Sequence, residues 1–181
     1  MRRNPIKSLF CLTLVYLLSS TSISFAASDG DLDTQSLGGA DVSLQIQSYF
    51  QISGMVDRNL GTWTGVGNLT SDDDVCVYTN LPSGAYRVIV TGSGSGGALT
   101  LIKGGDTLGY EAWWNDQPGS SGLVQVSAGT PLTGQTGANT TSHNCGGGNS
   151  ASLRIFIPSG NLASVPAGIY TGTVSVQIEA N

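Results

Sequence analysis

The stretch PAGIYTGTVSVQI at residues 166–178 decides which fold we expect for this chain. Its larger side chains recur at every second position, and the strand face they predict consists of Tyr170, Val174, Val176 and Ile178. A period of two is typical of a β-strand with one buried face, because successive side chains point to opposite faces. Only three residues follow this strand, so we expect one of its edges to be uncovered.

The sequence upstream predicts more short strands and no amphipathic helix, since no stripe of apolar residues at helical spacing is present. We expect strands at residues 75–79, 85–91, 98–103, 110–114, 123–126 and 152–158. Residues 68–74 predict an acidic turn, and residues 134–150 predict a long loop rich in Gly, Asn and Thr. Short strands between Gly, Asn, Pro and Ser turns predict an all-β fold, an antiparallel β-sandwich.

Residues 1–26 predict a secretory signal peptide. Three cations within residues 1–7 precede an apolar run at residues 9–18, which is too short to span a bilayer comfortably. We expect cleavage before Ala27, and we expect Cys11 to leave with the peptide. An uncleaved membrane anchor is the alternative.

The mature chain is expected to begin with a flexible tail that ends in a free strand. Residues 27–40 are polar and contain glycine, and Val42, Leu44 and Ile46 then alternate with polar residues. We therefore predict a tail at residues 27–47 and one sandwich domain at residues 48–181.

The charge of the mature chain argues against nucleic acid as a partner. Four cations remain against twelve acidic residues once residues 1–26 are removed, so the net charge is about −8. Nucleic-acid binding needs clustered Lys and Arg that displace counterions. The same acidity argues against binding to anionic membranes.

Cys76 and Cys145 are the cysteines that remain after signal removal, and an even pair in an exported chain predicts a disulfide. The loop of about 70 residues that it closes would stabilise the fold by roughly 4 kcal/mol in the chain-entropy model. Two buried free thiols are the alternative. A zinc site is disfavoured, because zinc takes four ligands and His143 is the only histidine.

The sequence predicts no catalytic residue, no metal site and no cofactor. Residues 92–97 match G-x-G-x-x-G, but a strand follows where a dinucleotide site needs a helix. The sequence has no G-x-S-x-G nucleophile elbow that could work with His143 as a catalytic base. Residues 72–74 lack the spacing of a calcium-binding loop. Glu111 and Asp116 could be paired glycosidase carboxylates, but a solvated pair is the simpler interpretation.

Trp113 and Trp114 are the candidates for a ligand-facing platform, with Asp116 beside them. Adjacent strand residues point to opposite faces, so at most one of these tryptophans faces outward. An exposed tryptophan would support sugar binding.

Several segments, in order, resemble the spore coat protein U-like family, which includes subunits of archaic chaperone–usher pili. The segments are LGTW at 60–63, CVY at 76–78 with YRV at 86–88, LGYEAWWND at 108–116, RIFIP at 154–158 and PAGIYTGTVSV at 166–176. This resemblance covers most of the mature chain.

The resemblance implies an incomplete immunoglobulin-like sandwich that lacks one strand beside its C-terminal strand. A periplasmic chaperone would fill the groove first, and the N-terminal segment of the next subunit would replace it at an outer-membrane usher. The donor face would be Val42, Leu44 and Ile46, and the acceptor groove would be lined by Tyr170, Val174, Val176 and Ile178. The expected location is the periplasm in transit and then the cell surface. A self-contained carbohydrate-binding module and a coat or matrix protein are the alternatives.

Overall fold

The computed structural model describes residues 27–181, so the predicted signal peptide lies outside the described residues. The chain divides into two units between Gln45 and Ile46. In the described part of the first unit, the backbones of Ser28 and Gly39 form one antiparallel bridge. Within residues 27–181, no helix is long and apolar enough to cross a membrane.

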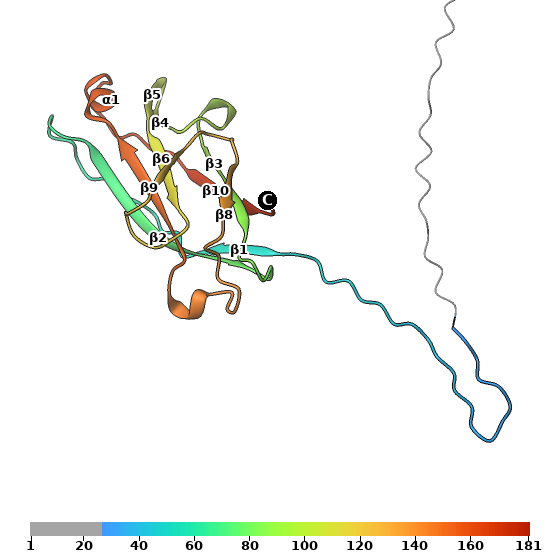
Figure 1. The fold of residues 1–181 in the computed structure, drawn as a ribbon. Helices are drawn as coiled ribbons and strands as arrows, with labels where there is room; N and C mark the ends of the chain where they lie inside the picture. Colours follow the sequence, from blue (N-terminus) through green and yellow to red (C-terminus); the bar gives the residue numbers. More distant parts are fainter. Residues whose placement is uncertain (1–26) are drawn as a thin grey trace, which may run out of the picture. The chain divides into compact units, whose positions relative to one another are not determined.

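The second unit consists of two antiparallel sheets and a small hairpin (Figure 1). The five-stranded sheet has the order β1 (Phe50–Ser53), β2 (Leu69–Thr79), β9 (Ala151–Ile157), β6 (Glu111–Asn115) and β7 (Val124–Val126). The three-stranded sheet has the order β10 (Val174–Glu179), β3 (Tyr86–Gly92) and β8 (Leu132–Gln135). β4 (Thr100–Lys103) pairs with β5 (Asp106–Gly109).

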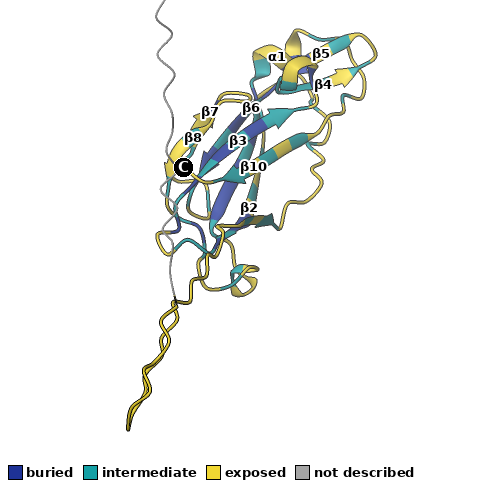
Figure 2. Cartoon of the chain, turned by 90° about the vertical axis from the view of Figure 1, so that its right-hand side faces the viewer, coloured by how far each residue is buried: buried dark blue, intermediate teal, exposed yellow. Residues whose placement is uncertain are grey.

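The core lies between these two sheets, and alternate side chains of β3 and β6 point into it. Val75 and Val77 of β2 and Val88 and Val90 of β3 are completely buried. Figure 2 shows buried residues along β3 and β6, whereas β10 carries only intermediate and exposed ones. The predicted all-β antiparallel sandwich is confirmed.

One hydrogen bond connects the two sheets through the middle of the core. The indole nitrogen of Trp114 in β6 donates to the hydroxyl oxygen of Tyr86 in β3 at 3.2 Å, and both side chains are fully buried. Burial raises the pKa of Tyr86 above its usual range. The bond satisfies two polar groups that would otherwise be costly to bury.

Several parts of the chain differ from the expected elements. β2 begins at Leu69, so the acidic residues 72–74 belong to a strand and not to a turn. The reason is a partner distant in sequence, because Asp72 lies directly across from Arg154 of β9 and forms a bidentate ion pair with it. The predicted loop at 134–150 also loses its first residues to β8, which pairs with β3.

One end of the sandwich carries the only regular helix among the described residues, α1 (Ser159–Ala163), next to the β4–β5 hairpin (Figure 1). The amide of Asn161 donates to the Gly109 carbonyl at 2.9 Å, which ties α1 to the end of β5. Leu162 of this short helix is buried and extends the core.

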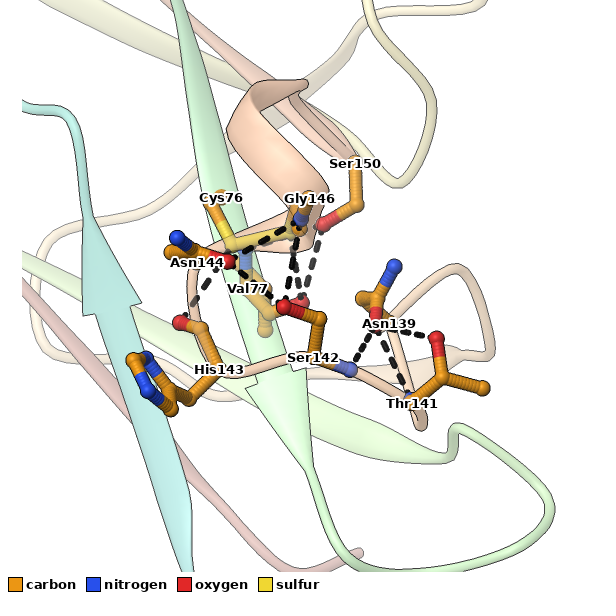
Figure 3. The surroundings of a disulfide bond; sticks show 10 residues. Cys76, Val77, Asn139, Thr141, Ser142, His143, Asn144, Gly146 and Ser150 are labelled. Carbon is orange, nitrogen blue, oxygen red and sulfur yellow. Dashed lines mark hydrogen bonds between the residues drawn. A yellow bond between two sulfur atoms is a disulfide. The ribbon is translucent and has the colours of Figure 1, made fainter.

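The opposite end of the sandwich is closed by a disulfide between Cys76 and Cys145 (Figure 3). The sulfur atoms are 2.06 Å apart, and the bridge joins β2 to the loop before β9. Ser150 supports the same place, because its hydroxyl donates to the Val77 carbonyl and accepts from the Val77 amide, both at 2.9 Å. Asn144 accepts hydrogen bonds from the Gly146 amide and the Ser142 hydroxyl, which fixes the loop around the bridge.

Candidate functional site

The C-terminal strand β10 has one paired edge and one open edge. It pairs with β3 through a regular antiparallel register from Val174 opposite Gly92 to Glu179 opposite Arg87. β10 stands at the margin of its sheet, and its other edge forms no backbone ladder with a strand of residues 27–181, although β1 lies close to part of it. An open edge of this kind can pair with an added strand.

A large groove runs along the start of this strand and into the core. Its volume is about 1110 Å³. One wall is the segment from Met55 to Trp63, and the other is the segment from Pro166 to Val174. Both walls lie within the second unit, so the groove belongs to the sandwich itself.

The floor of the groove is the hydrophobic core. The buried side chains that line it are Leu108, Tyr110, Ile155, Ile157 and Leu162. Other apolar residues of the lining are only half-buried, namely Leu60, Trp63, Leu69, Leu101, Val165, Tyr170 and Val174. Apolar surface that is left partly exposed in this way favours the binding of an apolar occupant.

Tyr110 contributes an unpaired polar atom to this lining. Its side chain is 7% exposed, and its hydroxyl has no hydrogen-bond partner within the part of the chain that the structure describes. Burial raises the pKa of this hydroxyl. Buried polar groups are normally paired, and because this hydroxyl has almost no open surface, an occupant of the groove can pair with it only if the lining shifts.

The Met55–Trp63 wall lies next to β2 without a ladder of backbone hydrogen bonds. It is held by Asp73 of β2, whose carboxylate accepts from the Val56 amide at 3.2 Å and forms an ion pair with Arg58. β1 pairs with β2 only from Cys76 to Thr79, so the start of β2 is paired on one side only. Side-chain contacts therefore hold this wall next to β2, whereas backbone hydrogen bonds would hold a further strand of a complete sheet.

The predicted groove residues fall into two groups. Tyr170 and Val174 line the groove, whereas Val176 and Ile178 lie further along β10, half-buried against the core and outside the lining. Tyr170 is also not part of β10, because the backbone next to it pairs with a different strand, β4. Thr171 exchanges two backbone hydrogen bonds with Ile102 of β4, so the expected strand from 170 starts only at Val174.

The predicted donor residues are exposed. Val42 is 95% exposed, Leu44 is 86% exposed and Ile46 is 75% exposed. These three apolar side chains occupy alternate positions, but residues 40–49 form no strand in the structure, so the free strand predicted at 42–46 is not formed there.

The structure places Trp113 and Trp114, two of the predicted ligand-facing residues, on opposite faces of β6. Trp114 is fully buried against Tyr86 and is not available to a ligand, whereas Trp113 is half-buried on the opposite face of β6. Asp116 lies beyond the strand, where its carboxylate accepts from the Thr136 amide at 3.1 Å. His143 is exposed in the disulfide loop.

Sequence reasoning missed most of the groove. Leu108, Tyr110 and Leu162 come from different elements, and their convergence depends on the sandwich. One sequence feature could have pointed to the Met55–Trp63 wall, because several apolar residues there follow no strand pattern. A segment of that kind next to a strand is a candidate for a partly covered edge.

A solved structure shares this fold. The match is to one chain of a structure described as "Chaperone-tip adhesin complex is vital for synergistic activation of CFA/I fimbriae biogenesis". The TM-score is 0.50 and the identity 19%, over 73% of this chain and 41% of that chain, so this protein spans less than half of its length. No protein-family model matches the chain, and no curated protein matches it. The likeness supports the β-sandwich fold.

Proposed function

We propose that this chain is a structural subunit of an extracellular pilus or fimbria-like surface fibre, assembled by donor-strand exchange and supporting adhesion or biofilm formation. One observation carries the proposal: an apolar groove opens beside an unpaired strand edge, and the same chain has exposed apolar side chains at alternate positions elsewhere. The groove needs an apolar strand, and the N-terminal segment has the alternation to form one.

The two parts match in chemistry. An added strand would bond to the free edge of β10 through its backbone, while every second side chain enters the groove. Val42, Leu44 and Ile46 have this spacing, and the polar residues between them would face solvent. A polar atom of the same strand could also pair with the hydroxyl of Tyr110.

Exchange between molecules would make a fibre. The donor is near the start of the mature chain and the acceptor near its end, so each copy has one of each. Such a contact is head-to-tail, and a head-to-tail contact that does not close forms a filament.

The partners follow from the same proposal. A periplasmic chaperone would fill the groove before assembly, an outer-membrane usher would exchange it for the next subunit, and the product would lie at the cell surface. The solved chain that shares this fold comes from a chaperone–tip adhesin complex, which agrees with a chaperone as partner. Membership of the spore coat protein U-like family and the absence of an enzymatic activity belong to this proposal.

The proposal is tested by placing a photo-crosslinking amino acid at Leu44 in the full chain. The matched control is Gln45, the next residue, which lies on the opposite face of the same segment. Crosslinks are mapped in a mixture of isotope-labelled and unlabelled chains. We expect Leu44 to crosslink to residues 55–63 or 166–174 of a different copy, and Gln45 to do so much less.

Crosslinks from Leu44 only to its own chain would contradict donor exchange. They would favour the second candidate, a self-contained secreted module whose N-terminal segment completes its own sandwich.

A further inference from the structure

The outer face of the five-stranded sheet carries an aromatic and charged surface that the groove does not use. In the register of β2, β9 and β6, Asp72, Arg154 and Trp113 form one row across three strands. Phe156 lies two residues along β9 from Arg154, on the same face. A cleft of about 300 Å³ opens here, and we name it the Trp113 cleft; its lining is Trp113, Ser120, Gly122, Leu123, Arg154 and Phe156.

The polar groups of this row are held in fixed positions. Arg154 donates from Nε and Nη2 to the two carboxylate oxygens of Asp72, at 2.6 and 2.7 Å. The indole nitrogen of Trp113 donates to the Glu111 carboxylate at 3.1 Å. A bidentate guanidinium and a tethered indole lose little side-chain freedom when a ligand binds, which favours affinity.

One wall of the cleft is a loop that is also anchored. Asn115, at the end of β6, donates from its amide to the Ser121 carbonyl at 2.7 Å. The Gly119 amide donates to the Asp74 carboxylate at 2.8 Å. These two bonds hold residues 119–122 next to the sheet, so the wall exists before any ligand arrives.

The chemistry of the cleft fits a ligand with an apolar flat face and hydroxyl groups at its edges. The aromatic side chains of Trp113 and Phe156 offer apolar surface, and aromatic rings accept C–H groups over their faces. Among the polar groups of the lining, the Ser120 hydroxyl can donate and accept hydrogen bonds, and Arg154 has five N–H donors of which Asp72 takes two. Asp72 and Glu111 adjoin the lining through their bonds to Arg154 and Trp113, so two acidic groups against one cation disfavour an anion.

We propose that the Trp113 cleft binds a neutral pyranose sugar, as part of a longer oligosaccharide. A pyranose ring has the required shape, with C–H groups on its faces and hydroxyls around its rim. The cleft volume is at the lower end of the range for small-molecule sites, about 300–1,000 Å³, which suits one or two sugar rings.

This site is independent of the fibre proposal. Alternation along β9 sends Ile155 and Ile157 into the core, where they line the groove, and sends Arg154 and Phe156 to the outer face. An occupied groove therefore leaves the Trp113 cleft open, and either proposal can fail without the other.

The test is calorimetric titration of the full secreted chain with maltohexaose, cellohexaose and mannohexaose, and with sialyllactose as the anionic sugar. We expect at least one neutral oligosaccharide to bind and sialyllactose to bind more weakly. Trp113→Ala should weaken that binding at least about tenfold, because it removes the stacking face. Trp113→Phe should retain part of it, which separates stacking from folding.

Tyr49→Ala is the matched control, because Tyr49 is an exposed aromatic residue that lines neither the cleft nor the groove. This control should leave the affinity within about twofold. The proposal is overturned if no neutral oligosaccharide of the panel binds, if Trp113→Ala binds as well as the unchanged chain, or if sialyllactose binds more tightly than all of them.

Discussion

The two halves of β2 show how one strand can belong to a finished core and to an open one. From Val75 to Thr79 the strand is almost continuously buried, and β1 covers the edge from Cys76 onward. From Leu69 to Asp74 it alternates between half-buried and exposed, and the segment beside it forms no ladder. A difference in β propensity between the two halves does not by itself explain this difference in burial. The halves differ because one has neighbours on both sides and the other faces a groove.

The largest effect should come from removing a side chain of the closed half. Trp114→Ala leaves a cavity and an unpaired Tyr86 hydroxyl, so we expect a loss of about 3–5 kcal/mol in the free energy of unfolding. Trp63→Ala, in the groove wall, should cost less than half as much, because Trp63 is only half-buried. Urea unfolding followed by circular dichroism measures both. Equal losses would show that the groove side is as tightly packed as the closed side.

The disulfide should rank next. Replacing Cys76 and Cys145 together with serine frees a loop of sequence separation 69, and the chain-entropy model predicts a loss of about 4 kcal/mol as an upper value. The measurement is the unfolding midpoint of the double variant against the oxidised chain. A loss below about 1 kcal/mol would mean that the closed end is held by its hydrogen bonds and packing instead.

Tyr110→Phe should have a small effect, which differs between the chain with an empty groove and the chain with an occupied groove. In the chain with an empty groove the substitution removes an unpaired buried hydroxyl, so stability should stay the same or rise slightly. With a strand in the groove it should weaken binding, if the strand supplies a partner to that hydroxyl. Thermal unfolding with and without a peptide of residues 40–50 measures this. Unchanged peptide binding would remove Tyr110 from the recognition of the occupant.

The smallest effect concerns acid. The hydrogen bonds and charge of Arg154 hold the pKa of Asp72 below its ordinary value of 3.8. Asp72 therefore stabilises the fold above about pH 4, and this contribution disappears as the pH falls below 3.8 toward its lower folded value. The side chain is 38% exposed, so the effect is small. Asp72→Asn should remove that part of the acid dependence, which unfolding experiments at pH 3 and pH 6 can detect.

The sequence allowed the local features to be predicted, and the distant pairings escaped. The alternation of Val174, Val176 and Ile178 predicts β10 correctly, because strand periodicity is a local property. The acidic run at 72–74 predicts a turn but forms a strand, since its partner Arg154 is 82 residues away and no local signal connects them. The same distance hides the row that joins Arg154 to Trp113.

Trp113 and Trp114 show which features can be predicted from strand periodicity and which cannot. Alternation requires that the two point to opposite faces, which the structure bears out. Which of them is buried depends on the sheet that covers β6, and that sheet is built from β3 and its neighbours. The groove floor has the same dependence, since Leu108, Tyr110 and Leu162 meet only after the sandwich has formed.

The most direct test of the account adds a missing strand to the chain. A variant without residues 27–45, the described part of the first unit, is mixed with a peptide of residues 40–50, and the unfolding temperature is followed. We expect the variant to stay folded and its unfolding temperature to rise with peptide concentration, as for any ligand that binds only the native state. A peptide with Leu44→Asp should give no rise. If the variant is unfolded without the peptide, or if the peptide leaves its unfolding temperature unchanged, the groove is not the acceptor for a strand from another copy.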